Sequence, residues 1–440
     1  MEDYAGVSER MVKKATALGA QDAVADIYLN RNYQVRFSQN QVDISNKWRN
    51  IAGWLFVAVD RRLVFTEIND FSRADKVVEN TVKVARRSQE NPEYGGIAAG
   101  PFRYRASKPD RKITELEDGG DLVQAGIQAA VKAGAKETAG VFWRYDEEHF
   151  LHTSGGVSAT RRGANLYFSL RALRSLEESG HGVECATRFA DFHPERAGEK
   201  AGEIAKAVKK PGKGEAGKYD VVFDTLFLGS MIDQIGGRAG AFEVRAGLSP
   251  LKDKVGKPIA SDIVTLYDDS TANTMGARPF DDEGVPSQRN VIVERGVLKT
   301  YLHNTSTAKL FSTRTTANAG LVAPGSNALV LEPGDHTKEE LFEQVRDGLY
   351  VTNTWYTRYQ SYVTGDFSTI PRDGIFRIKN GKIAGSVKDI RLTDNILGLW
   401  QRMEALSKET QEVMWWGEVH VPTIVPYGLA RQVGFTRSSM

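Results

Sequence analysis

Cysteine is nearly absent from this chain of 440 residues, because Cys185 is the only one. No intrachain disulfide can form, and no cysteine cluster can hold a metal. No apolar run approaches the length that crosses a membrane, and the first thirty residues contain no apolar signal-peptide core. A strong charge of one sign is also missing, since the formal charge at pH 7 is +2. These absences favour a cytoplasmic protein that binds neither nucleic acid nor membrane.

The common catalytic motifs are absent too. The chain contains no H-E-x-x-H, no phosphate loop, no G-x-S-x-G and no dinucleotide fingerprint. His149 and His152 stand three apart in a predicted strand, so they should face opposite sides and share no metal. Cys185 lies in a strand-like stretch, where a small buried apolar role is more typical than a nucleophilic one.

The hydrophobic pattern of the N-terminal half predicts an α+β domain over residues 1–210. An amphipathic helix is followed by period-two alternation and a second helix that begins at Ser72, and the same order then recurs. We therefore expect a helix–antiparallel meander–helix arrangement with a structural pseudo-repeat. The predicted segments are helix 5–18, strands within 23–68, helix 121–134, strands within 139–190 and helix 195–209.

Residues 211–218 are predicted to be a linker, because this Gly- and Lys-rich segment has no apolar anchor. A strand-rich C-terminal domain should occupy residues 219–440. Thr337 and Glu340 have the spacing of a helix capping box, and Asn380-Gly381 suits a type I′ hairpin turn. The other predicted elements are strands 263–267, 289–294, 297–302 and 327–331, a last helix from Thr393 through Leu406, and extended chain over 417–435.

The longest apolar helix of the chain is predicted directly after the strand 219–223. Asp224-Thr225 suits its start, Leu228, Met231, Ile232 and Ile235 recur at helical spacing, and Gly236-Gly237 should end it. Its last turn carries polar residues on an otherwise apolar element, namely Asp233, Gln234 and Arg238.

Several motifs follow one another in a fixed order along the C-terminal half. The longest is DDEGVPSQRNVIVERGVLKTYLHNTSTAKLF, residues 281–311. The others are ANAG (317–320), GLYVTN (348–353), TGDFS (364–368) and IKNGKI (378–383). In this order they resemble the TldD/PmbA family of peptidases, which is also labelled modulator of DNA gyrase, and the resemblance extends over nearly the whole chain.

The resemblance implies a subunit without the family's metal site. TldD-type subunits carry His-Glu-x-x-x-His on this helix and a Cys near the C-terminus, which together hold a zinc with the Glu as general base. The motif falls here on Asp233, Gln234 and Arg238, and the Cys position falls on residues 416–418, which are Trp-Gly-Glu. A guanidinium has no lone pair for a metal, and an amide is no general base.

This chain is accordingly similar to the TldE/PmbA-type subunit. The resemblance implies a heterodimer with a TldD-type catalytic subunit that acts on unfolded proteins or peptides. It implies no cofactor in this chain and zinc in the partner.

Two simpler interpretations stay open for the singled-out side chains. Asp233 and Arg238 could form an ion pair at the end of the helix. An aromatic group could line a peptide cleft or an interface, where aromatic residues are enriched, or could be ordinary core. That group comprises Trp355, Tyr356, Tyr359, Trp415 and Trp416.

Two other functions also stay open. An independent hydrolase could use Asp281, Asp282 and Glu283 with His303, although the DDEG segment also suits a turn. A regulatory binding protein of the gyrase-modulator type is the other alternative. Near-neutral charge argues against direct DNA binding, because phosphate contacts supply most non-specific affinity.

Overall fold

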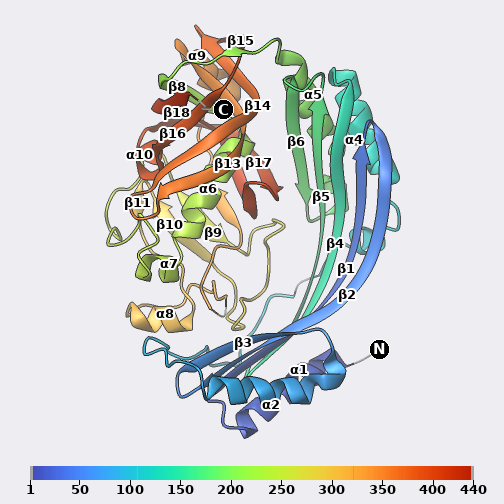
Figure 1. Cartoon of the computed structure of the whole chain (residues 1–440), viewed down its shortest axis with the longest axis vertical. Coiled ribbons are helices and arrows are strands. Elements are labelled where there is room, and N and C mark those ends of the chain that lie inside the picture. The colour runs from blue at the N-terminus through green and yellow to red at the C-terminus, as the bar shows by residue number, and fades with distance from the viewer. Residues whose placement is uncertain (1–2, 107, 321, 438–440) are drawn as a thin grey trace.

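The computed structural model describes residues 3–106, 108–320 and 322–437. Two β-sheets with helices on them form the molecule (Figure 1). The N-terminal sheet is long and curved, and its order is β3-β2-β1-β4-β5-β6 with every pair antiparallel. Its strands are β1 (Asp22–Ser38), β2 (Gln41–Val59), β3 (Arg62–Ile68), β4 (Glu137–Thr153), β5 (Ser158–Leu173) and β6 (Ser179–Ala186).

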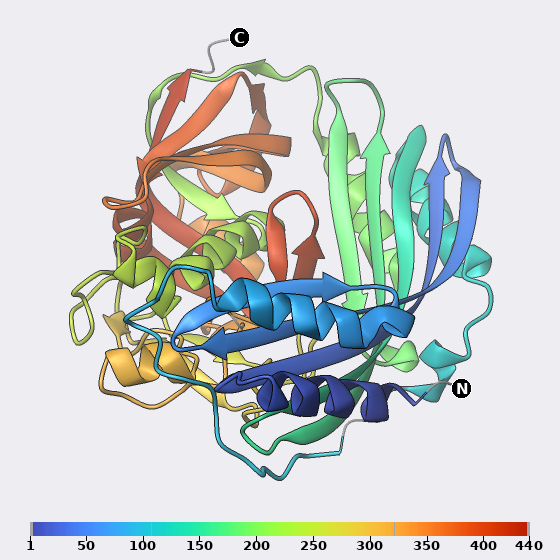
Figure 2. The ribbon, with the colours of Figure 1, turned by 60° about the horizontal axis from the view of Figure 1, so that its bottom comes forward.

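The predicted repeat is present. A helix, three strands and a helix occur twice, and β1 pairs with β4 where the two copies meet. Figure 2 shows α1 and α2 lying side by side across one end of the sheet. The helices are α1 (Tyr4–Ala17), α2 (Ala74–Ala85), α3 (Arg111–Thr114), α4 (Gly120–Ala133) and α5 (Pro194–Ala207), with 3₁₀ turns η1 (Phe71–Arg73) and η2 (Phe189–Asp191).

Strand periodicity places both helix pairs on one face of this sheet. On β1, Ala25 and Ile27 pack under α1 and α2, while Val35 and Phe37 pack in the cluster under α4 and α5. Odd residues of a strand share one face. The even residues, such as Val24 beside Phe280, therefore face the C-terminal half of the chain.

The C-terminal half is strand-rich, as predicted. Its main sheet has the order β11-β10-β9-β12-β18-β8-β13-β14-β15-β7, with β16 and β17 joined to it. The strands are β7 (Gly212–Lys213), β8 (Gly217–Phe223), β9 (Leu266–Asp269), β10 (Arg289–Glu294), β11 (Val297–Leu298), β12 (Leu329–Leu331), β13 (Asp347–Ser361), β14 (Asp366–Lys379), β15 (Lys382–Lys388), β16 (Ile390–Asn395), β17 (Met403–Trp415) and β18 (Val419–Arg437). The helices are α6 (Thr225–Arg238), α7 (Ala241–Arg245), α8 (Thr305–Leu310), α9 (Lys338–Glu343) and α10 (Ile396–Gln401).

Some local predictions are confirmed and others are wrong. The Thr337–Glu340 capping box and the hairpin at Asn380-Gly381 are present. Ser72 does not cap α2, because Asp70 caps a 3₁₀ turn there and α2 begins at Ala74. The predicted linker is not free of secondary structure, since β7 pairs with β15 and β8 begins within it.

The predicted last helix is too long. It covers only residues 396–401, and Leu406 lies in β17, which pairs with β18. Pairing with a distant strand decides this segment, because helix propensity is weak against tertiary contacts.

The two halves of the chain are joined by side-chain contacts through β6 and α5. Asp373 of β14 accepts hydrogen bonds from Arg171 at 3.0 Å and from Ser179 at 2.9 Å. Lys200 of α5 lies 2.5 Å from Asp224, which precedes α6. The contact between Lys200 and Asp224 ties the start of α6 to the N-terminal half of the chain.

Candidate functional site

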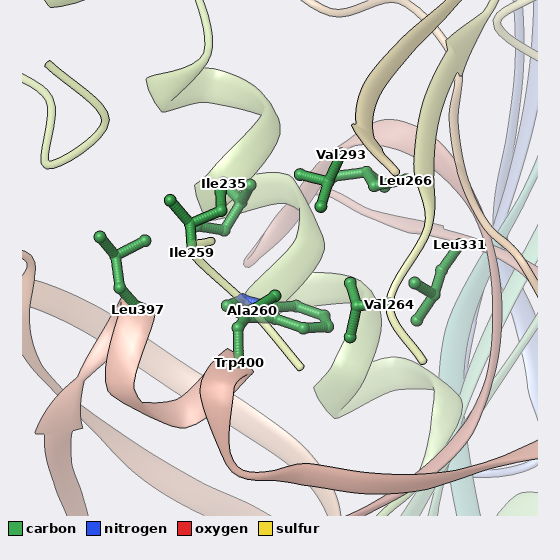
Figure 3. Close-up of a pocket in the computed structure, with 9 residues that line it drawn as sticks. All are labelled: Ile235, Ile259, Ala260, Val264, Leu266, Val293, Leu331, Leu397 and Trp400. Carbon is green, nitrogen blue, oxygen red and sulfur yellow. The ribbon is translucent and has the colours of Figure 1, made fainter. Parts of the chain in front are cut away.

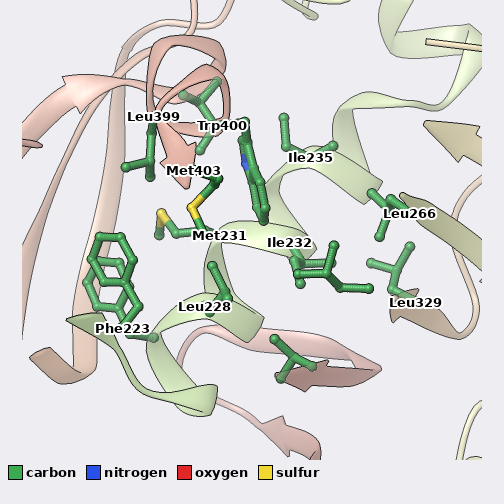
Figure 4. Close-up of a cluster of buried hydrophobic side chains, with 14 of the residues drawn as sticks. Phe223, Leu228, Met231, Ile232, Ile235, Leu266, Leu329, Leu399, Trp400 and Met403 are labelled. Carbon is green, nitrogen blue, oxygen red and sulfur yellow. The ribbon is translucent and has the colours of Figure 1, made fainter. Parts of the chain in front are cut away.

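Helix α6 is buried along nearly its whole length. Only Gln234, Gly237 and Arg238 are not fully buried. Its apolar residues, among them Leu228, Met231 and Ile232, pack in the largest hydrophobic cluster of the C-terminal half (Figure 4). The functional question therefore concerns its last turn, where polar side chains follow this apolar face.

The helix ends at Arg238, one residue beyond the Gly236-Gly237 pair where the sequence predicted its end. A Cβ at Gly236 would lie 2.4 Å from Leu329 Cδ1, so glycine allows close packing against β12. Gly236 therefore also marks a close contact that the sequence did not reveal.

A small cavity beside α6 can be set aside as a binding site. Its volume is about 10 Å³, and Ile235, Trp400 and other apolar residues line it (Figure 3). A space of this size holds at most one water, and an apolar lining offers a water no partner.

Asp233 is buried and is fixed to the start of β18. Its carboxylate accepts main-chain N–H groups from His420 at 3.3 Å and from Val421 at 3.1 Å. Burial raises the pKa of Asp233, against the opposing effect of those two N–H groups. The contact brings the β17–β18 turn, residues 416–418, next to the last turn of α6.

Arg238 does not pair with Asp233. Its Nη1 donates to the carbonyl of Leu248 at 3.3 Å, and its guanidinium lies 4.5 Å from the ring centre of Tyr362 and 5.5 Å from that of Tyr359. The ion pair considered from the sequence is thus not formed. A guanidinium on aromatic faces is held by cation–π attraction, and it cannot ligate a metal.

The singled-out aromatic residues gather at the same place. Trp355 stacks on Trp415 at 5.7 Å between ring centres, and Trp416 meets Trp355 edge-on at 5.9 Å. Trp415 is buried, whereas Trp416 is 76% exposed and Tyr356 is 48% exposed. The group is therefore part core and part open surface.

Glu418 fixes the backbone of this group. Its carboxylate accepts the main-chain N–H groups of Tyr356 and Thr357. Tyr356 has a φ of 65°, a left-handed conformation that costs a non-glycine residue energy. A Cβ at Gly417 would lie 2.2 Å from the Trp415 ring, so the turn also requires glycine.

Among the described residues, no set of metal ligands lies outside this region either. Within residues 3–106, 108–320 and 322–437, three or more His, Cys, Asp or Glu side chains nowhere gather so as to hold a metal ion. Across the same residues, none of the helices is long and apolar enough to span a bilayer.

The acidic DDEG segment forms a braced loop. Asp281 accepts the N–H groups of Glu283, Val285 and Ala319 at 2.9 to 3.0 Å. Burial raises the pKa of Asp281 to about 6 and that of Glu283 to about 8. Asp281 is thus saturated by main-chain donors that hold the loop.

The ring of His303 is not hydrogen-bonded to the carboxylates of that loop. Its ring packs against Phe311 at 5.4 Å between centres, and its Nδ1 lies 3.4 Å from Thr307 Oγ1. Burial lowers the pKa of His303 to about 4. A neutral histidine with no carboxylate bonded to it lacks the arrangement of a general base.

A series of hydrogen-bonded side chains that the sequence did not reveal resembles a serine nucleophile with its histidine. Ser169 Oγ lies 2.9 Å from His181 Nε2, and Asn353 Nδ2 lies 3.0 Å from both His181 Nδ1 and Asp373 Oδ2. Asn353 Oδ1 accepts the N–H of Thr354, which fixes the amide orientation. His181 Nδ1 must then accept, so its Nε2 carries the proton and donates to the serine.

That proton arrangement excludes activation of the serine, because a nitrogen that already donates cannot take a proton. Burial also lowers the pKa of His181 to about 3. The network joins β5, β6, β13 and β14, and no local sequence signal connects these four strands. Cys185 is likewise no thiolate nucleophile, since burial raises the pKa of its thiol well above the usual value.

Comparison with known proteins identifies relatives of the C-terminal half. A family model described as the PmbA/TldA metallopeptidase C-terminal domain matches residues 216–437, half of the chain. A metalloprotease of Methanothermobacter thermautotrophicus is 33% identical over 221 residues, which are 49% of this chain and 47% of the relative. A metalloprotease TldD homolog of Buchnera aphidicola is 28% identical over 203 residues, 44% of this chain and 41% of the relative.

The matched region thus spans less than half the length of these two relatives. The fold, in contrast, is shared over the whole chain. The crystal structure of TldE from Thermococcus kodakarensis has a TM-score of 0.85 and covers 98% of this chain and 100% of its own, with 18% sequence identity.

Proposed function

This chain belongs to the PmbA/TldD metallopeptidase family, and from that premise we propose that it is the TldE/PmbA-type subunit, which holds no catalytic metal. It acts as one half of a heterodimer whose TldD-type subunit binds zinc and cleaves unfolded proteins or peptides. We place the pair in the cytoplasm.

The side chains at the expected metal site support this proposal, because together they lack the ligands of a zinc site. Asp233 on α6 is hydrogen-bonded to residues 420 and 421, directly after the turn 416–418, where the family resemblance expects two histidines and a cysteine. Asp233 is occupied by two N–H groups, and Arg238 rests on tyrosine rings. The turn offers tryptophan, glycine and glutamate in place of a thiolate. One carboxylate without nitrogen or sulfur partners is not a zinc site.

Peptide binding in the complex fits the exposed aromatic residues beside this turn. Trp416 presents an exposed apolar ring, and Tyr356 is half exposed although Arg358 lies 3.8 Å over its ring. Aromatic residues are enriched in the centres of protein interfaces. We assign them to contact with the partner subunit or with the peptide held between the two subunits.

The test is reconstitution. The purified chain should contain far less than one zinc per molecule by mass spectrometry, and it should leave an unfolded peptide intact. Addition of a TldD-type subunit should give cleavage that a chelator stops. Zinc near one per chain in the isolated protein, or cleavage without the partner, contradicts the proposal.

A further inference from the structure

A polar pocket on the inner face of the N-terminal sheet has a feature that the proposed function does not explain. Its volume is about 220 Å³, and it lies between strands β4 and β5 and the loop 275–279. The residues that matter are Glu147, His149, Arg161, Asn165, Arg278 and Asn327. Two arginines from opposite walls therefore share one small space.

Arg161 lacks a carboxylate partner. Among the described residues, none of its nitrogens makes a salt bridge within 4.0 Å, and its one polar contact is Nη2 to His149 Nε2 at 3.4 Å. Its guanidinium otherwise lies 5.8 Å from the ring centre of Phe280. Burial and the charge of Arg278 lower the pKa of Arg161, and the carboxylates of this chain that oppose this shift act on it only from a distance, without a hydrogen bond to it.

The neighbouring residue shows what a satisfied arginine looks like on this strand. Arg162 binds both oxygens of Asp146, at 3.0 and 2.8 Å. Such bidentate pairing is the usual arrangement of a partly buried guanidinium. The contrast between Arg161 and Arg162 is one of environment, because the residue type and strand are the same.

Arg278 is only weakly paired as well. Its Nη1 lies 3.4 Å from Asp282 Oδ1, and its Nε is buried without a hydrogen-bond partner among the described residues. Asn327, whose backbone lies beside Gly276, also has a buried Nδ2 without a partner in the part of the chain that the structure describes. Buried donors are normally satisfied, so their gathering around two arginines points to an acceptor from outside the chain.

The surrounding charges limit the acceptor to a single negative charge. Glu147 and Asp282 stand at the pocket with partly exposed carboxylates, and they would repel a second charge on the ligand. The volume suits an amino-acid side chain or the end of a peptide. A carboxylate also fits the planar fork of a guanidinium.

We propose that Arg161 and Arg278, with Asn327, form a binding site for a carboxylate group. The ligand is an acidic side chain or the terminal carboxylate of a peptide. That the ligand is a peptide rests on the proposed function, whereas the carboxylate chemistry rests on the pocket alone.

Calorimetric titration of the full chain tests the site. The probes are N-acetyl-glycylglycine with a free carboxylate, its carboxamide, N-acetylglutamic acid α-amide and inorganic phosphate. At least one carboxylate should bind with a Kd in the roughly millimolar range, about tenfold tighter than the carboxamide and phosphate. The tighter of the two carboxylates identifies a chain end or a side chain as the ligand. Equal binding of the carboxamide, tighter binding of phosphate, or no binding of either carboxylate overturns the proposal.

Arg161→Gln separates a binding role from a structural one. It should weaken carboxylate binding about tenfold, while the Tm of the ligand-free protein stays equal or rises because a largely buried cation without a salt bridge is removed. Arg174→Gln, which removes a surface arginine paired with Glu178 just after β5, is the matched control and should bind as wild type. Unchanged binding in Arg161→Gln, or a lowered ligand-free Tm, overturns the assignment. Zinc content and cleavage do not enter these measurements, so the proposed function can fail or stand separately.

Discussion

The two ends of α6 carry the same residue type in opposite surroundings. At the first end, Asp224 is fully buried and receives Lys200 at 2.5 Å together with the hydroxyl of Tyr350. At the last turn, Asp233 receives only two main-chain N–H groups. The first end is closed by side chains from both halves of the molecule, while the second is held by the backbone of one hairpin.

The difference appears in the charges. Burial alone would raise the pKa of Asp224, but Lys200 and Lys338 lower it below its usual value. Burial raises the pKa of Asp233, and the two main-chain N–H groups and the charge of His420 offset this only in part. A carboxylate with an ammonium partner is a structural clamp. Asp233 has no such partner, and it occupies the position where the family resemblance expects a metal ligand. The role of Asp224 as a clamp therefore does not depend on the proposal that a metal site was lost, whereas the interpretation of Asp233 does.

Loss of the clamp should give the largest effect. Lys200→Met leaves Asp224 buried without its cation and should lower the free energy of unfolding by about 3–5 kcal/mol. Urea unfolding measures it. Lys206→Met, on the same helix at an exposed position, is the control and should change stability by less than about 0.5 kcal/mol. A loss below about 1 kcal/mol for Lys200→Met would show that the first end is not clamped by charge.

The adjacent glycines of the last turn should respond in opposite directions. Gly236→Ala forces a methyl group into the Leu329 side chain, which lies 2.4 Å from the added Cβ, and should cost about 1–3 kcal/mol. Gly237→Ala meets no atom within 4 Å and should stabilise the helix by about 0.5–1 kcal/mol. Thermal unfolding of the two variants side by side provides the measurement. Equal effects would contradict the packing described for this turn.

These glycines also show what the sequence could and could not predict. The apolar spacing of Leu228, Met231 and Ile235 located α6 correctly, because helical periodicity is a local property. The end of the helix was predicted to within one residue, because Gly-Gly is a stop signal in sequence. The contact of Gly236 with Leu329 was not visible in the sequence.

The candidate site had the same limit. Chemistry alone excludes Arg238 as a ligand, and this follows from the sequence. The hydrogen bond that brings Asp233 beside the start of β18 joins residues 188 positions apart and came only from the structure. The sequence could not show that Arg161 lacks a salt bridge either. Arg162, the next residue, is also an arginine and does have a carboxylate partner.

The pH dependence of stability should have opposite signs at the two ends. Asp224 contributes stability above the ordinary carboxyl pKa of 3.8, and this is lost as the pH falls through its lowered folded pKa. The native state holds a proton on Asp233 above 3.8, so stability falls as the pH rises toward its raised folded pKa.

Urea unfolding between about pH 3 and pH 7 separates these contributions. Asp224→Asn should make the free energy of unfolding less sensitive to acid. Asp233→Asn should remove the fall in the free energy of unfolding that the wild type shows as the pH rises above 3.8. Wild-type slopes in both variants would mean that the two carboxylates do not differ in the folded state.

The smallest expected effect is the coupling energy between Asp233 and Arg238, which tests whether the last turn contains an ion pair. Asp233→Ala should cost about 1–3 kcal/mol, because it leaves the N–H groups of His420 and Val421 unsatisfied. Arg238→Gln should cost about 0.5–1 kcal/mol through the lost contacts with the tyrosine rings. No hydrogen bond or salt bridge joins the two side chains, and they share only the electrostatic environment of Tyr359. A double-mutant cycle should therefore give a coupling energy of at most about 0.5 kcal/mol. A coupling well above that value would show that Asp233 and Arg238 hold each other, and the last turn would then be a charge clamp like the one at Asp224.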